Sequence, residues 1–260
     1  MKLERLELEA EDGVARVWLN RPAVRNAFDG QMVTELRKVV DDLSAKESVR
    51  VIVVGGRGKV FCAGADLEWM KAVAAFSRED NLREAGEMAE LFSAISASPK
   101  PFVARVHGAA LGGGAGLVAA CDIAVAALGT RFGFTEVRLG LIPAVISPYV
   151  VGRIGESAAR ELILTGERVD AAKAHEIGLV RVVVPAEELD AAVDGRVREL
   201  LQAGPRALAE AKALLRAVAG RPAEDVRADT VERIANVRAS AEGQEGLRAF
   251  LEKRTPRWVR

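Results

Sequence analysis

The sequence predicts an α/β protein with a helical C-terminal region, and three observations support this fold class. Short apolar runs rich in Val and Ile alternate with stretches of helical periodicity through the first half of the chain. Glycine-rich segments lie between several of these runs, as expected for turns that join buried strands to helices. After about Pro185 the pattern changes to successive helices rich in Ala, Leu, Glu and Arg, with no strand candidate between them.

The first half contains five strand candidates and two long helix candidates. The continuous β-branched run Val51–Val54 is typical of a strand buried on both faces. The first helix candidate repeats apolar residues such as Met32, Leu36 and Leu43 at helical spacing. In chain order we expect strands near residues 3–8, 14–19, 51–54, 102–106 and 123–126, and helices over 31–46 and 80–97.

The C-terminal region consists of four helix candidates without a long linker before them. We expect these helices over residues 187–203, 205–219, 223–241 and 245–254. The chain is therefore expected to divide into an α/β core, residues 1–195, and a helical region, residues 196–260.

Composition and charge narrow the classes of protein to which the chain could belong. Among 260 residues, 37 Lys and Arg balance 37 Asp and Glu, and half of the residues are hydrophobic. This is the composition of a globular protein, and the zero net charge argues against a nucleic-acid partner, which would require a basic excess or stripe. The stretch 110–128 is rich in Gly and Ala and contains Asp122, so we expect a buried segment and no membrane contact.

Cysteine and histidine usage argues against a disulfide framework and against a metal site. Cys62 and Cys121 belong to no CxxC pair, and the only histidines are His107 and His175. The N-terminal residues become charged at once and form no apolar segment of a signal peptide. We therefore expect a cytoplasmic protein without a metal.

Two segments of small residues predict a site built from backbone N–H groups. Gly108–Gly116 carries five glycines within nine residues, so another group can approach its backbone closely, and it precedes an expected helix whose N-terminus favours negative charge. The second segment, Phe61–Leu67, contains Ala-Gly-Ala; its alternative role is an ordinary loop with Asp66 as a helix cap. Tight packing is the alternative for the first segment. Together the segments predict paired donors aimed at one oxygen, as in an oxyanion hole.

Glu136 is the candidate for proton transfer. It lies within the largely apolar segment Phe132–Pro143. Such surroundings raise the pKa of a carboxyl group, which can then exchange protons near neutrality. The alternative is a solvated carboxylate at the start of a helix.

Two nucleotide-binding motifs do not fit the sequence. Gly58-Lys59 lacks both the upstream glycine and the following Ser or Thr of a phosphate loop. The run Gly114-x-Gly116-x-x-Ala119 matches a loose dinucleotide fingerprint, with Glu136 as its acidic residue. However, the next expected strand ends near Ala126, whereas the acidic residue of a dinucleotide fold ends that strand.

Along essentially its whole length, the sequence resembles the enoyl-CoA hydratase/isomerase (crotonase) family. The matching motifs are Leu19–Pro22 with Asn26-Ala27, Phe61–Leu67, Gly108–Gly116 with Cys121-Asp122, Phe132–Pro143, Leu164–Glu167, Gly178–Val180 and Gly246–Arg254. The resemblance implies a spiral of ββα units that holds the acyl-CoA site and a C-terminal helical region used to form trimers, often paired as hexamers. It also implies that no cofactor is needed, because coenzyme A enters as part of the substrate.

The resemblance also implies roles for individual residues. The two N–H groups that stabilise an enolate fall on Ala65 and Gly113, and the catalytic carboxylate falls on Glu136. Phe250 and Lys253 would help to hold coenzyme A across a subunit interface. The residues expected along the substrate within the chain itself are Ala63, Asp66, Leu67 and Gly112.

One departure from the family pattern concerns the number of catalytic carboxylates. Typical hydratases carry two glutamates, and the first would fall at Gly116, which has no side chain. Glu136 would then have to activate water for attack at Cβ and return a proton to Cα, either itself or through that water.

Within the family, the chain most resembles the methylglutaconyl-CoA hydratase branch, which implies a branched acidic substrate and a place in fatty acid or leucine catabolism. The segments that carry this likeness are 65–70, 143–149 and 240–246. Where most members have a glycine-rich stretch, this chain has Ala144-Val145-Ile146, which should reshape the acyl pocket. Candidates for the group that meets a second substrate carboxylate are Lys71, Arg83 and Ser147.

Two other functions stay open. A Δ-isomerase needs only one base to move a proton along an allylic enolate, so Glu136 would satisfy it as well. A CoA-binding or oligomerisation protein that has lost activity together with its first glutamate is the non-enzymatic alternative.

Overall fold

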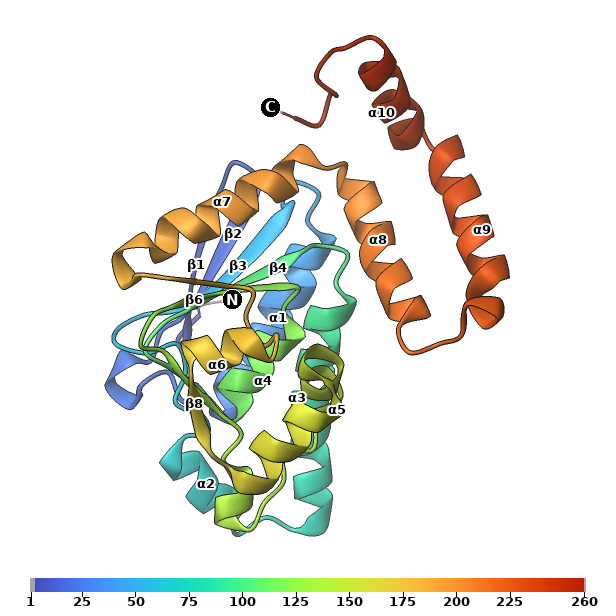
Figure 1. The fold of residues 1–260 in the computed structure, drawn as a ribbon. Coiled ribbons are helices and arrows are strands. Elements are labelled where there is room, and N and C mark those ends of the chain that lie inside the picture. Colours follow the sequence, from blue (N-terminus) through green and yellow to red (C-terminus); the bar gives the residue numbers. More distant parts are fainter. Residues whose placement is uncertain (1–2, 260) are drawn as a thin grey trace.

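The computed structural model describes residues 3–259, and its larger sheet forms the centre of the N-terminal part (Figure 1). The strand order is β1-β2-β3-β4-β6-β9, with β1 and β2 antiparallel and the remaining neighbours parallel. The strands are β1 (Leu6–Glu11), β2 (Val14–Leu19), β3 (Val51–Gly56), β4 (Phe102–Val106), β6 (Ile123–Ala127) and β9 (Val182–Val184).

A second, three-stranded sheet contains the segments next to the predicted site. Its order is β5-β7-β8, with β5 parallel to β7 and β7 antiparallel to β8. The strands are β5 (Ala109–Leu111), β7 (Arg131–Gly133) and β8 (Arg168–Asp170). These strands and β9 were not predicted, because three-residue strands are too short to show a periodic pattern.

Helices cover both faces of the larger sheet. Alternate strand residues such as Ile52 and Ala104 face the main core, where the packed helices are α1 (Gly30–Ala45), α3 (Arg78–Ala97), α4 (Gly113–Ala120) and α5 (Ser147–Thr165). The intervening residues, such as Val53 and Val103, pack against α7 (Leu189–Gln202) on the other face. This two-sided burial explains the continuous apolar runs of the parallel strands.

Short helices complete the α/β part. They are α2 (Leu67–Val73), α6 (Ala171–Glu176) and the 3-10 helices η1 (Pro22–Val24), η2 (Glu136–Leu139) and η3 (Ala186–Glu188). The expected strands and helices of the first half are confirmed, with shifts at their ends. The first strand begins at Leu6 rather than Leu3. Gly55 and Gly56, expected in a loop, continue β3. A Cβ on Gly55 would lie 2.5 Å from Trp18 Cζ3, so the packing of Trp18 favours glycine there.

The last three helices extend away from both sheets and form what we call the arm (Figure 1). They are α8 (Pro205–Val218), α9 (Ala223–Ala239) and α10 (Ala241–Leu251). Helix α10 begins four residues before the expected position because Ser240 caps it, accepting a hydrogen bond from Gly243 N at 3.1 Å. The expected boundary at residues 195 and 196 falls inside α7, which packs against the larger sheet, so the separate helical part starts at α8.

The arm is tied to the α/β part by Lys212. Its ammonium group lies 2.7 Å from Asp122 Oδ2 and donates to Lys100 O at 3.0 Å. Within residues 3–259, no helix combines the length and the apolar character needed to cross a membrane.

Candidate active site

The first predicted donor segment is held between strand β5 and the backbone of Phe28. Cys62 N donates to Ala109 O and Leu111 N donates to Cys62 O, both at 3.0 Å, so the segment pairs with β5. On its other side, Phe28 N donates to Gly64 O and Phe28 O accepts from Asp66 N, both at 2.8 Å. These bonds fix the residues on either side of Ala65, whose own N–H has no acceptor among the described residues.

The second donor segment lies alongside the first. Gly112 adopts a positive φ of 51° and its N–H donates to Gly133 O at 2.9 Å, which turns the chain into α4. A Cβ on Gly112 would lie 3.8 Å from Gly64 Cα, so the two segments are in close contact. Gly113 is the first residue of α4, and its N–H also finds no acceptor within residues 3–259. Ala65 and Gly113 therefore each directly follow one of two touching glycines and carry a free N–H.

Glu136 lies against this pair of segments. It begins η2, directly after β7 and Phe134-Thr135, and its Oε1 is 3.2 Å from where a Cβ on Gly112 would be. Its Oε2 is buried and has no hydrogen-bond partner among the described residues. Burial raises the pKa of Glu136 above its ordinary value of 4.5. A carboxyl group with one unpaired oxygen and a raised pKa is suited to accept and return protons.

Gly116 lies one turn further along α4, where Gly116 N donates to Gly112 O at 3.0 Å. The space where its side chain would begin is filled by Ile146. This position supplies no carboxylate, so Glu136 is the carboxylate that the structure brings to the two donor segments.

Asp66 has the capping role that the sequence analysis gave as its alternative. Its Oδ1 accepts from Glu68 N at 2.8 Å and Trp69 N at 3.2 Å, which starts α2. Its other oxygen lies 2.9 Å from Arg21 Nη2. The Asp66 carboxylate is buried and paired, and its backbone is paired as well, because its N–H donates to Phe28 O and its carbonyl oxygen accepts from Met70 N, both at 2.8 Å.

Sequence reasoning missed two residues that organise the site, Arg21 and Asn26. Arg21 Nη2 also lies 3.1 Å from Oδ2 of Asp29, the N-cap of α1, so one guanidinium joins the caps of α1 and α2. The buried Asn26 accepts from Arg21 N at 2.8 Å and donates to Val60 O at 2.9 Å. Both residues belong to the motif Leu19–Pro22 with Asn26-Ala27, so that motif was the available signal.

The other predicted binding residues are spread more widely. Ala63 N donates to Arg25 O at 3.0 Å, and Leu67 is 74% exposed at the start of α2. Phe250, at 82% exposure, lies on α10, and Lys253 follows that helix. Figure 1 shows α10 at the opposite end of the molecule from α2, so these two residues do not join the site of their own chain.

The three candidates for meeting a second substrate carboxylate differ in their surroundings. Lys71 and Arg83 are exposed and each lies 2.6 Å from a carboxylate three residues away on its own helix, Glu68 and Asp80 respectively. Ser147 donates to Ala144 O at 2.8 Å. Of the three, it is the one adjacent in sequence to Ile146, which packs beside Gly116.

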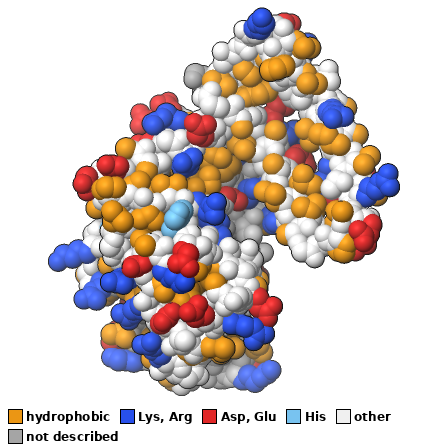
Figure 2. Space-filling model, viewed as in Figure 1, with side chains coloured by type: hydrophobic (Ala, Val, Ile, Leu, Met, Phe, Trp, Pro, Cys, Tyr) orange, Lys and Arg blue, Asp and Glu red, His pale blue; other side chains and the backbone are white. Residues whose placement is uncertain are grey.

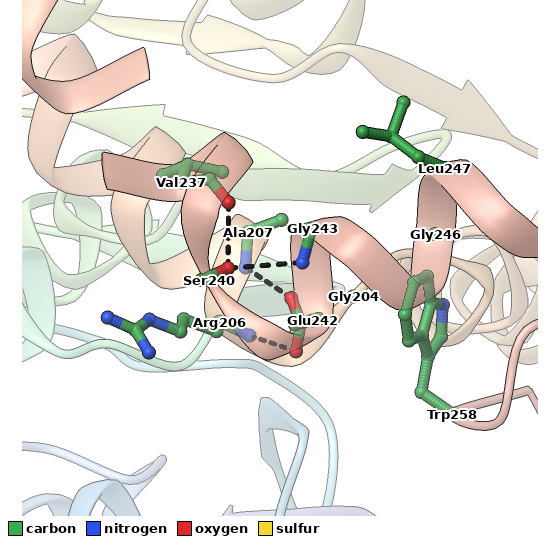
Figure 3. A pocket seen from close by; sticks show the side chains of 10 residues that line it. All are labelled: Gly204, Arg206, Ala207, Val237, Ser240, Glu242, Gly243, Gly246, Leu247 and Trp258. Atoms are coloured by element: carbon green, nitrogen blue, oxygen red, sulfur yellow. Dashed lines mark hydrogen bonds between the residues drawn. The ribbon is translucent and has the colours of Figure 1, made fainter. Parts of the chain in front are cut away.

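A pocket in the arm has different chemistry from this site. It has a volume of about 250 Å³ and lies between α8, α10 and the terminal Trp258 (Figure 3). Its acidic residue, Glu242, accepts from Arg206 N at 3.1 Å and Ala207 N at 2.8 Å and thereby caps α8. With both carboxylate oxygens occupied, the pocket offers no free acid or base.

Sequence and structure comparisons match nearly the whole chain. The family model described as enoyl-CoA hydratase/isomerase matches residues 9–260. A solved enoyl-CoA hydratase from Shewanella pealeana is 42% identical, with a TM-score of 0.96 over 99% of this chain and 97% of that chain. A crotonyl-CoA hydratase of Syntrophomonas wolfei is 33% identical, over 100% of this chain and 99% of its own length. The 2,3-dehydroadipyl-CoA hydratase of Escherichia coli is 31% identical, over 98% of both chains.

Proposed function

Because this chain belongs to the enoyl-CoA hydratase/isomerase family, we propose that it hydrates a branched acidic enoyl-CoA thioester with Glu136 as its only catalytic carboxylate. The chain is an enoyl-CoA hydratase-type carbon–oxygen lyase, as its relatives are. The proposal adds the substrate class and the residues that perform the reaction.

The observation that carries the proposal is the position of Glu136. Its Oε1 lies against Gly112, the residue before the Gly113 N–H, and Gly112 in turn touches Gly64, the residue before the Ala65 N–H. The residues that precede the two donors thus contact each other, and the carboxyl group that lies against one of them has an oxygen without a partner among the described residues.

This arrangement supports hydration in two steps. In the first, Glu136 takes a proton from water as the water oxygen bonds to Cβ, and the π electrons move to the thioester oxygen. The Ala65 and Gly113 N–H groups stabilise that enolate oxygen, and each such donor typically contributes about 10²–10³ in kcat. In the second step, the proton returns from Glu136 to Cα as the carbonyl reforms. The product therefore carries both hydrogens of the water, and dehydration follows the same path in reverse.

The substrate class is proposed from the likeness to the methylglutaconyl-CoA hydratase branch. The name of the Escherichia coli relative denotes a dicarboxylic acyl group, so its reaction is of a related kind. The buried Ile146 at the start of α5 gives this chain an apolar wall near the site, which suits a branched acyl group. Ser147, the next residue, is the candidate we favour for meeting the distal carboxylate.

We also propose that the enzyme assembles as a trimer or a hexamer. The arm exposes large apolar side chains (Figure 2), which mark surfaces that another chain covers. Phe250 and Lys253, remote from their own chain's Glu136, would then reach the coenzyme A of a neighbouring subunit, while Ala63, Leu67 and Gly112 line it within the chain. The exposed apolar residues of the arm are Leu215, Val231, Ile234, Leu247, Phe250 and Leu251.

A panel of thioesters tests the function. The purified enzyme is mixed with 3-methylglutaconyl-CoA, crotonyl-CoA and a non-conjugated 3-enoyl-CoA, and the absorbance of the conjugated thioester is followed. We expect 3-methylglutaconyl-CoA to lose absorbance with a higher kcat/KM than crotonyl-CoA. A gain of absorbance with the 3-enoyl-CoA would instead establish the isomerase, and calorimetric binding without any turnover would establish the inactive CoA-binding protein.

A further inference from the structure

Ile146 occupies the space in which a side chain at position 116 would begin. A Cβ on Gly116 would lie 2.7 Å from Ile146 Cβ and closer still to Ile146 Cγ2, with Cδ1 at 3.2 Å. Real side chains do not approach so closely, so one of the two residues must give way. Ile146 is 2% exposed and belongs to the main core, which leaves it no open space to move into.

The backbone of Ile146 is also fixed. It is the N-cap of α5, and its carbonyl oxygen accepts from Tyr149 N and Val150 N, both at 3.1 Å. Tyr149 packs against Phe92 of α3 with ring centroids 6.0 Å apart. The first turn of α5 therefore presses Ile146 toward α4 and cannot swing away without losing these contacts.

Gly112 is the N-cap of α4, and Gly116 lies one turn further along the helix. At Gly112 the open space holds the carboxylate of Glu136, and at Gly116 it holds the side chain of Ile146. The place from which a second carboxylate would enter the site is thus filled by hydrocarbon.

We propose that Ile146 is a specificity-determining residue that makes this a one-carboxylate site, because its side chain excludes any side chain at position 116. The inference rests on the proposed function for its consequence in catalysis. It restricts the enzyme to acyl groups that Glu136 alone can process. It also means that replacing Gly116 by Glu cannot add a second carboxylate unless Ile146 is removed as well.

A double-mutant cycle measures the steric coupling directly. The variants Gly116→Ala, Ile146→Gly and their combination are unfolded thermally alongside the wild type. Gly116→Ala should lower the unfolding midpoint, and the double variant should lose clearly less than the sum of the two single losses. Gly114→Ala is the matched control, because the atoms nearest to its Cβ belong to Cys62, with Cys62 Cβ at 2.7 Å, and none of them belongs to Ile146. When Gly114→Ala is combined with Ile146→Gly, the decrease in unfolding midpoint should equal the sum of the two single decreases.

The outcomes separate the proposal from its alternatives. Additive losses at positions 116 and 146, like those of the control pair, would overturn it. If Gly116→Ala alone does not fold, the proposal predicts that the double variant with Ile146→Gly does fold. Failure of both variants to fold would also overturn the proposal.

Activity measurements supply the second test. Gly116→Glu with Ile146→Gly should hydrate crotonyl-CoA about tenfold or more faster than Ile146→Gly alone, within the range of general acid–base contributions. Gly116→Glu alone should bring no gain. No gain in the double variant would show that Ile146 does not limit the reaction. The unfolding cycle is independent of catalysis, so it stands even if Glu136 proves not to be the base, and the substitution of Glu136 tests that separately.

Discussion

Four glycines at the start of α4 each leave room for a different neighbour. The space beside Gly112 holds Glu136, that beside Gly113 holds Phe28 at 3.4 Å, and that beside Gly114 holds Cys62. The space beside Gly116 holds Ile146. Glycine destabilises a helix interior relative to alanine, by about 0.5–1 kcal/mol per residue. In α4 that cost is offset by close packing that brings two donor segments and a carboxyl group together.

The raised pKa of Glu136 makes protein stability depend on pH. Because burial raises that pKa above 4.5, the folded state binds this proton more tightly than the unfolded state does. The stabilisation that this proton gives the folded state is fully present below the unfolded-state pKa of Glu136, and it is lost as pH rises through the folded-state pKa. We therefore expect Glu136→Gln to be more stable than the wild type at neutral pH, with the difference vanishing toward pH 4.5.

Urea unfolding at a series of pH values measures this difference. The free energy of unfolding of Glu136→Gln minus that of the wild type should grow with pH and then level off. A difference that stays constant with pH, or shrinks as pH rises, would mean that the Glu136 carboxylate is not penalised by burial.

At this scale the sequence predicted the kind of site but not how its residues are held. Two segments of small residues and an apolar setting for Glu136 were visible in the pattern, and the family resemblance assigned the donors to Ala65 and Gly113. The filling of the space beside Gly116 by Ile146 was not, because it depends on how α5 packs against α4, thirty residues away along the chain. No local pattern carries that information.

Among the elements, α1 and α2 are joined by Arg21. Their N-caps, Asp29 and Asp66, both pair with its guanidinium, which also donates to Ala27 O at 2.6 Å. The bond from Asp66 N to Phe28 O continues this connection to the backbone beside Ala65. We infer that Arg21 positions the Ala65 N–H without touching the substrate.

Replacing Arg21 by Met should therefore affect catalysis as well as stability. The buried Asp66 carboxylate would lose its cationic partner, which should cost about 3 kcal/mol or more, whereas the half-buried Asp29 keeps its ion pair with Arg5. A displaced donor should lower kcat by up to about 10²-fold, with a smaller change in KM. Arg21→Lys should recover part of the kcat loss. The matched control is Arg37→Met on α1, whose pairs with Asp41 and Glu90 are exposed and are worth about 0.2–1 kcal/mol each.

Steady-state kinetics at a temperature where all variants are folded tests whether Arg21 positions the Ala65 N–H in addition to stabilising the fold. An unchanged kcat in folded Arg21→Met would show that Arg21 serves stability alone.

The sequence predicted the long elements more successfully than the short ones. Helix α1 and strand β3 have strong periodic patterns or continuous apolar runs, and both were expected within two residues of their observed ends. The smaller sheet was missed, since β7 and β8 have three residues each and depend on pairing with distant segments. This sheet includes β7, which ends three residues before Glu136.

In the whole molecule, the crotonase fold implied by the resemblance is confirmed by the family match and by solved relatives. The arm is the part of the molecule that exposes many apolar side chains in a single chain. Helices α8 to α10 together bury few side chains, although they contain many apolar residues. The proposed assembly could not be derived from one chain's periodicity, because the proposed partner surface would lie on another copy.

Light scattering coupled to size exclusion tests the assembly. The wild type should have three or six times the mass of one 260-residue chain. Replacing Phe250 and Leu251 by Ser should shift the mass toward that of a monomer and raise KM for the thioester. Leu8→Ser, on β1 and outside the arm, should leave both unchanged. A monomeric wild type would contradict the proposed role of the arm.

The turnover of Glu136→Gln tests the central claim most directly, with the best substrate of the panel. Gln keeps the size of the side chain, so calorimetric affinity for the thioester should hold within a few-fold, while kcat should fall by about 10²–10⁴-fold. A sole carboxylate should lie at the upper end of that range. Near wild-type turnover would contradict a one-carboxylate mechanism. The base would then be sought among Glu68, Asp80, Glu84 and Glu87, beginning with Glu84, whose pKa is raised by burial and by the charge of Glu87.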